Sequence, residues 1–152
     1  IIVAAGVFNS FLSSAKVPQT LAEFFITSDL NPWIILLGML ALYLVLGTVM
    51  DSIAMIFLPW PSFSPIVAQL GFGLTPTEVG LWFGILVLRS AEVGLITPPV
   101  GLNLFVINNL DKNIPMIETY KGALPFVASD VIRIIILVGF PGITLFLVRL
   151  LF

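Results

Sequence analysis

The ten residues GLITPPVGLN (94–103) carry the groups best suited to chemistry in this chain of 152 residues. Two adjacent prolines framed by glycines are expected to unwind a helix here, because proline lacks a backbone N–H and clashes with the preceding turn. The unwound backbone frees the carbonyl oxygens of Gly94, Leu95 and Ile96, and Thr97 adds a hydroxyl. Neutral oxygen ligands on unwound backbone suit sodium. The segment therefore predicts a sodium site.

The flanking sequences EVGLI and LNLFVINNL stay apolar, which indicates that the interruption lies within a membrane helix. Inside hydrocarbon, unwound backbone is tolerated only where protein buries it or where it lines a watery cavity. A half-helix beginning near Val100 would direct its N–H groups toward an anion, and Asn103 lies in it. The alternative is a proline kink that serves packing only. The tandem prolines beside Thr97 favour a functional site.

Asp51 is the only charged residue between Asp29 and Glu78. A carboxylate inside a membrane is costly and usually marks an ion or substrate path, so we expect Asp51 at the tip of a helical hairpin, where it helps to hold a cation. Alternatively, residues 30–50 and 52–70 both cross the membrane and Asp51 caps a turn in water. A re-entrant hairpin is favoured because three prolines interrupt and shorten the second limb, namely Pro59, Pro61 and Pro65.

Two pairs of opposite charges stand three positions apart on predicted helices. Arg89 and Glu92 either supply a counter-charge for a substrate or form an internal ion pair. Asp130 and Arg133 lie one turn apart in the last apolar stretch, so they can neutralise each other.

The composition identifies the medium in which these groups lie. Hydrophobic residues make up 59% of the chain and charged residues 9%, whereas a soluble domain carries about 25% charge. With a mean hydropathy of +1.18, the chain is predicted to be an all-α membrane protein. The absence of Cys and His removes thiolate and imidazole chemistry, and a net charge of -2 gives no basic patch for nucleic acid. We therefore expect neither an enzyme nor a nucleic-acid-binding protein.

Four segments are expected to position the candidate residues. Residues 1–30 hold the end of a transmembrane helix and an interfacial arm helix, and residues 31–70 form the re-entrant hairpin. Residues 71–110 form a loop and the discontinuous transmembrane helix, which Thr75 is expected to cap. Residues 111–152 form a polar connection and a final transmembrane helix starting near Gly122. The apolar opening IIVAAGVFNSFL has no basic leader, so we expect the chain to be one portion of a larger membrane protein.

Several of these motifs resemble one known family. GLITPPVGLNLFV closely resembles the signature in the C-terminal half of the large membrane subunit of tripartite ATP-independent periplasmic (TRAP) transporters. The likeness extends over nearly the whole chain, through VPQTLAEFF, the hairpin tip LGTVMDSIAMIFLP, the linking segment LGFGLTPTEVG and the stretch ALPF with the closing helix.

The resemblance implies a sodium-driven importer of a small organic acid, of dicarboxylate or sugar-acid type, in the bacterial inner membrane. It implies an elevator mechanism on inverted repeats, with this chain as the C-terminal third or so of the subunit, without the first inverted half. The partners it implies are the remaining N-terminal part of the same large subunit, a small membrane subunit, a periplasmic substrate-binding protein and membrane lipid. The residues it assigns to sodium or substrate are Gly47, Asp51 and Ser52 at the hairpin tip, and Gly94, Thr97, Pro98, Pro99, Gly101 and Asn103 at the break, with Gly94, Thr97 and Asp51 as the sodium ligands.

Two alternatives remain open at the level of sequence. The chain can be a membrane scaffold or assembly subunit whose kinks serve packing only. It can also belong to a proton-driven symporter that uses Asp51 or Glu92.

Overall fold

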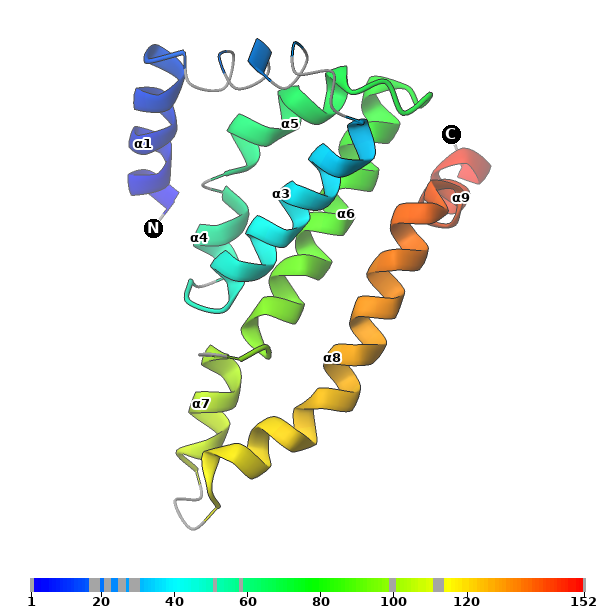
Figure 1. Cartoon of the computed structure of the whole chain (residues 1–152). Helices are drawn as coiled ribbons and strands as arrows, with labels where there is room; N and C mark the ends of the chain where they lie inside the picture. Colours follow the sequence, from blue (N-terminus) through cyan, green and yellow to red (C-terminus); the bar gives the residue numbers. More distant parts are fainter. Residues whose placement is uncertain are drawn as a thin grey trace.

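The chain folds into helices, seen in Figure 1, and the computed structural model describes residues 2–16, 20, 23–24, 27, 31–50, 52–57, 59–98, 101–110 and 114–151. No strand occurs within these residues, so the expectation of an all-helical chain is confirmed for them. The helices are α1 (Ile2–Ser14), α3 (Pro32–Gly47), α4 (Ser52–Phe57), α5 (Trp60–Gln69), α6 (Pro76–Leu95), α7 (Leu102–Asn108), α8 (Met116–Gly139) and α9 (Pro141–Leu151).

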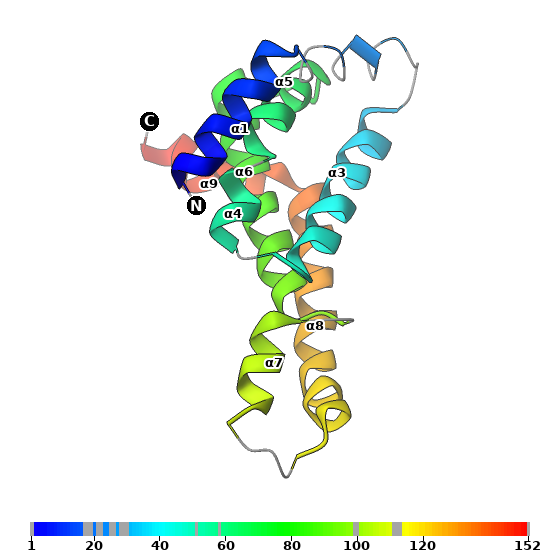
Figure 2. The ribbon, with the colours of Figure 1, turned by 90° about the vertical axis from the view of Figure 1, so that its left-hand side faces the viewer.

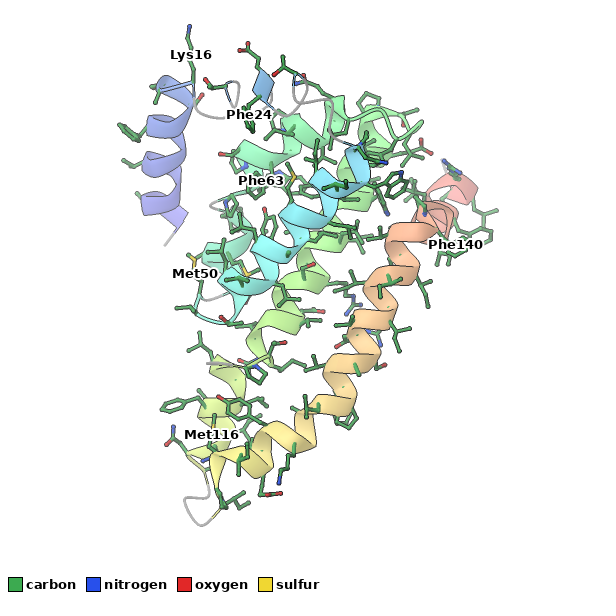
Figure 3. The ribbon with its side chains drawn as sticks, in the orientation of Figure 1. Lys16, Phe24, Met50, Phe63, Met116 and Phe140 are labelled. Carbon is green, nitrogen blue, oxygen red and sulfur yellow. The ribbon has the colours of Figure 1, made fainter. Side chains whose placement is uncertain are left out.

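Helix α3 runs toward α4, and the chain then returns through α4 and α5 (Figure 1). Asn31 caps α3 by accepting the backbone N–H of Trp33 at 3.0 Å. Met50 lies at the turn that follows α3 (Figure 3). The return limb is divided between α4 and α5, as the prolines predict, although Pro65 lies inside α5 without ending it.

Helix α6 is the centre of the packing. Thr75 and Glu78 form a capping box at its start, and Pro76 is the first helical residue, so the predicted cap is confirmed. One face of α6 carries the fully buried Trp82 and Phe83, which pack against aromatic side chains of α3 and α5. This aromatic core fixes the hairpin on α6, so that the end of α3 meets the end of α6.

Helix α8 runs alongside both α6 and α7 in the two perpendicular views (Figures 1 and 2). It begins at Met116, earlier than the expected start near Gly122, so residues 116–121 are helical rather than part of a connection. The polar residues that suggested a loop lie on the helix surface, where Lys121 pairs with Glu118 at 2.9 Å. Phe140 marks the turn between α8 and α9 (Figure 3), so the expected final helix is divided in two.

Two helices of the described residues are long and apolar enough to cross a membrane, Pro76–Ile96 with 21 residues and Met116–Gly139 with 24. The interfacial helix expected before Asn31 falls largely on residues outside those that the structure describes.

Candidate functional site

The hairpin and the broken helix meet at two glycines. A side-chain carbon added to Gly94 would lie 2.6 Å from the α-carbon of Gly47 and 2.8 Å from the carbonyl oxygen of Leu44. A carbon added to Gly47 would lie 2.9 Å from the α-carbon of Gly94 and 3.1 Å from the carbonyl oxygen of Ala91. The two helices therefore touch backbone to backbone, which only small residues permit. This contact joins two predicted site segments that are far apart in the sequence.

The helix breaks two residues beyond Gly94 because two donors are missing. In a continuous helix, the carbonyls of Gly94 and Leu95 would accept from the N–H groups of residues 98 and 99, which are both proline and have none. The carbonyl of Gly94 instead accepts the backbone N–H of Thr97 at 3.1 Å, which tightens the last turn. The carbonyl of Leu95 cannot make the equivalent bond to the residue three positions later, because that residue is Pro98. Its oxygen is therefore left without a local helical donor.

Thr97 is half-buried at this break, and its hydroxyl is oriented by the helix. Its Oγ1 donates to the carbonyl oxygen of Val93 at 2.6 Å. A hydroxyl has one proton and two lone pairs, so a hydroxyl that donates to its own helix turns its lone pairs elsewhere. The Thr97 oxygen is thus available to a cation, whereas its proton is already used.

Gly101 closes the break and is the N-cap residue of α7. Its φ of 54° is left-handed, a conformation that glycine adopts at little cost. A side-chain carbon there would lie 3.4 Å from the carbonyl oxygen of Thr97, so the backbone before the break folds against Gly101. Gly101 is buried, whereas Pro98 and Asn103 are exposed.

The structure brings together some of the predicted site residues and not others. Gly47, Gly94, Thr97 and Gly101 lie at or beside the contact between α3 and α6 and the break that follows it. Ser52 begins α4 on the far side of the hairpin turn. Asp51, Pro99 and the expected half-helix start at Val100 lie outside the described residues.

Thr48 is a polar group at this contact that the sequence alone did not single out. It follows Gly47 directly, is 5% exposed, and donates its hydroxyl to the carbonyl oxygen of Val45 at 2.8 Å. It therefore presents its lone pairs in the same way as Thr97. Its place immediately after a glycine in the tip motif LGTVMD is the only signal that the sequence offers.

Both predicted charge pairs are present. Arg89 Nη1 lies 2.7 Å from Glu92 Oε2, and Arg133 Nη1 lies 2.9 Å from Asp130 Oδ1. Of the two roles considered for Arg89 and Glu92, the internal ion pair is the one seen in this chain. Among the described residues, no group of three or more His, Cys, Asp or Glu side chains could hold a metal. The oxygens gathered near the break are hydroxyls and carbonyls, a donor set that fits sodium.

Comparison with known proteins identifies the family. Residues 1–143 match the family described as "Tripartite ATP-independent periplasmic transporter, DctM component". The chain belongs to this family. The DctM-type large permease subunits are transport proteins, so the resemblance deduced from the motifs and the expectation that the chain is not an enzyme are both confirmed.

Individual members of the DctM family match the chain over nearly its whole length. The C4-dicarboxylate TRAP transporter large permease protein DctM of Pseudomonas aeruginosa is 35% identical over 95% of the chain. The sialic acid TRAP transporter large permease protein SiaM of Vibrio cholerae is 30% identical over 98%, and the sialic acid permease SiaT of Haemophilus influenzae is 29% identical over 99%. The chain spans 32%, 33% and 23% of these relatives, respectively.

Proposed function

We propose that the chain is part of the transport core of a TRAP large membrane subunit and that the whole protein imports a small organic acid together with sodium across the bacterial inner membrane. The backbone contact of Gly47 with Gly94, beside the Thr97 hydroxyl, is the observation that carries this proposal. It gathers neutral oxygens from a hairpin end and from a helix break, the arrangement from which secondary transporters build sodium sites near the membrane midplane.

The lengths of the limbs support a re-entrant hairpin. Helix α3 has 16 residues, which span about 24 Å at 1.5 Å per residue, whereas the hydrocarbon core is about 30 Å thick. The return limb is divided into α4 and α5. A hairpin that enters and leaves on one side would place its turn within the membrane, beside the break between α6 and α7. In an elevator mechanism, the hairpin and the broken helix move together as one packed unit.

The residues of this chain would act on sodium through orientation and desolvation. Thr97 presents a hydroxyl oxygen whose proton is already donated, and the break presents the carbonyl of Leu95, which Pro98 and Pro99 leave without a helical donor. Bound sodium would supply a positive charge that favours an anionic substrate nearby. The neutral protein oxygens at the break do not compensate this charge. Sodium and the anionic substrate would therefore each favour the binding of the other.

The relatives guide the choice of substrate and partners. The Pseudomonas, Vibrio and Haemophilus permeases are named for C4-dicarboxylates and sialic acid, which supports an organic acid for this chain. Within the whole protein, residues 1–30 would supply a scaffold helix end and an arm, while residues 31–70 and 71–110 would form the moving part with the helix of residues 111–152. The remaining part of the large subunit, a small membrane subunit and a periplasmic binding protein would complete the transporter.

Uptake into proteoliposomes that contain the complete transporter tests this function. We expect a labelled organic acid to accumulate with an inward sodium gradient and not with potassium in its place. Thr97→Ala should weaken the sodium dependence and Thr97→Ser should preserve it. The matched control is Thr20→Ala, because the Thr20 hydroxyl also donates to a carbonyl four residues earlier, at 3.0 Å, but lies far from the break in sequence. The sodium site is contradicted if the rate of uptake is the same in sodium and in potassium. It is also contradicted if neither Thr97→Ala nor Asp51→Ala changes sodium-dependent uptake.

The two alternatives give different results. A proton-driven symporter that uses Asp51 or Glu92 would show uptake that follows pH at fixed sodium. A scaffold subunit would show no aqueous site at the break. The chain has no Cys, so single thiols at positions 51 and 97 can be probed directly with a polar reagent. Thiols that never react, in sodium or without it, would favour the scaffold.

A further inference from the structure

Helix α7 cannot hold its own position. It has seven residues, whereas isolated helices shorter than about 12 residues are marginal in water. Leu104 is its only buried side chain. The break before it removes the helical hydrogen bonds that would otherwise tie it to α6. Its orientation must therefore come from the helix against which it packs.

That helix is α8. Helix α7 packs more extensively against α8 than against α6, and Figures 1 and 2 show α8 passing beside both half-helices. One side-chain hydrogen bond fixes the distal end of α7, since Thr119 Oγ1 donates to Asn108 Oδ1 at 2.6 Å in a partly buried setting. Another fixes α6, since Trp82 Nε1 donates to the carbonyl oxygen of Leu137 at 2.8 Å. Helix α8 is thus bonded on both sides of the break.

The position of α7 affects the backbone at the break. The carbonyl of Gly101 accepts the N–H of Phe105 at 3.0 Å, so Gly101 moves with the first turn of α7. A side-chain carbon added to Gly101 would be in van der Waals contact with the Thr97 carbonyl oxygen, at 3.4 Å, so the two residues are close neighbours at the break. A tilt of α7 about Gly101 therefore changes the space around the Thr97 oxygens. A bound cation needs its oxygen ligands at contact distance, so a tilt that displaces the Thr97 oxygens would weaken the site.

We propose that Asn108 and Thr119 are positioning residues for the cation site at the break: their hydrogen bond sets the angle of α7, and through Gly101 it sets the geometry around Thr97. This inference rests on the proposed sodium site. Neither residue is a ligand, because their bond joins the end of α7 that is remote from the break, about 10 Å along the helix from Gly101.

The thermal stability of the complete purified transporter in detergent, measured over a sodium titration, tests the inference. Potassium keeps the ionic strength constant, and no substrate is needed. A ligand that binds only the folded state stabilises it by RT ln(1 + c/Kd), where c is the free ligand concentration, so fitting Tm against the sodium concentration gives an apparent Kd for sodium. Replacing one partner of the hydrogen bond should raise the apparent Kd for sodium about threefold to tenfold in Asn108→Leu and in Thr119→Val. Thr119→Ser should return it to near the wild-type value.

The neighbouring Asn109 provides a matched control. Among the described residues, its side chain bonds to its own helix, with Nδ2 donating to the carbonyl oxygen of Phe105 at 2.9 Å, so Asn109→Leu should leave the apparent Kd for sodium unchanged. The double variant Asn108→Leu with Thr119→Val should have the same apparent Kd for sodium as either single variant, because both substitutions remove the same hydrogen bond. These results support the inference.

Three other outcomes overturn it. A wild-type transporter that sodium does not stabilise removes the proposed sodium site and this inference with it. If sodium raises the Tm of the wild type, and the apparent Kd for sodium is the same in Asn108→Leu and Thr119→Val, only the positioning role is overturned. Equal changes in the apparent Kd for sodium in Asn108→Leu and Asn109→Leu also overturn the positioning role, since any change near the end of α7 would then have the same effect.

Discussion

Gly47 and Gly94 are 47 positions apart in the sequence, yet each occupies the space that a side chain on the other would need. The contact places the last turn of α3 on the last turn of α6, immediately before both helices stop. Each glycine is followed within three residues by a threonine whose hydroxyl donates to its own helix, namely Thr48 and Thr97. The contact therefore packs the hairpin onto α6 and joins two helix ends that each carry a threonine hydroxyl.

The first prediction concerns Gly94→Ala. The added methyl group would lie 2.6–2.9 Å from backbone atoms of α3, which cannot rotate away, so the two helices must separate. We expect a loss of stability of about 2 kcal/mol or more and loss of transport, measured by thermal unfolding and uptake of the complete transporter. Gly80→Ala is the control on the same helix, since nothing lies within 4 Å of its added carbon. Equal effects of the two changes would show that the close approach has no special role.

Features that depend on neighbours in sequence could be predicted from the sequence. The Thr75 cap, the divided return limb, the helix break at Pro98 and the two charge pairs each follow from residues a few positions apart, because capping, proline geometry and pairing at i,i+3 are local effects. The start of α8 was predicted too late for the same reason. Polar residues around Glu118 indicate a loop as much as the exposed face of a helix.

Relations between distant segments could not be predicted in this way. Nothing local pairs Gly47 with Gly94, or Asn108 with Thr119, because these pairs depend on how α3, α7 and α8 pack. The resemblance to the TRAP family assigned Gly47 and Gly94 to the site, but it did not state that they touch. Thr48 was missed because a threonine in an apolar helix usually bonds to its own helix, and only its burial at the contact distinguishes it.

The second prediction concerns Tyr43, a fully buried residue of α3 whose hydroxyl has no hydrogen-bond partner among the described residues. Its ring packs edge-on against Phe63 and Phe83. Removing an unpaired buried hydroxyl costs nothing in hydrogen bonding, so Tyr43→Phe should leave stability unchanged or raise it by up to about 1 kcal/mol. Trp82→Phe is the contrast, because it removes the bond to the Leu137 carbonyl and should destabilise by about 1–3 kcal/mol. A clear loss in Tyr43→Phe would mean that another part of the transporter pairs the hydroxyl.

The third prediction concerns the attachment of α9 to the start of α6. Glu78 Oε1 accepts from Arg149 Nε at 2.7 Å, while Oε2 accepts from the N–H and hydroxyl of Thr75, both at 3.0 Å. Arg149→Met removes one bond, whereas Glu78→Ala removes the bridge and the capping box together. We therefore expect Glu78→Ala to lower Tm more than Arg149→Met does. A thiol placed at Leu145, a fully buried residue of α9, should become equally accessible in both variants, since both release α9. Equal losses of Tm would show that the cap contributes nothing.

The last prediction concerns the charges between α6 and α8. Arg89 lies seven residues after Trp82 and Asp130 seven before Leu137, and Trp82 bonds to Leu137. Seven residues make about two turns, so in these antiparallel helices Arg89 and Asp130 lie at one height on facing sides. Their intrahelical partners, Glu92 and Arg133, lie within one turn of that height and complete a neutral layer of four charges, about 9 Å thick, within the two helices that can cross a membrane.

Because the layer is neutral as a whole, removing one charge should lower the stability more than removing a pair of opposite charges. Arg89→Gln leaves a net negative charge at that depth and should destabilise by about 2 kcal/mol or more, and adding Glu92→Gln should recover most of the loss. The pair Glu118 and Lys121 has the same spacing at the exposed start of α8, with 2.9 Å between its charges. Lys121→Gln should therefore cost less than about 1 kcal/mol. Thermal unfolding of the complete transporter measures all three. If Arg89→Gln were as mild as Lys121→Gln, the Arg89 layer would be in contact with bulk water rather than enclosed by the membrane or by the rest of the subunit.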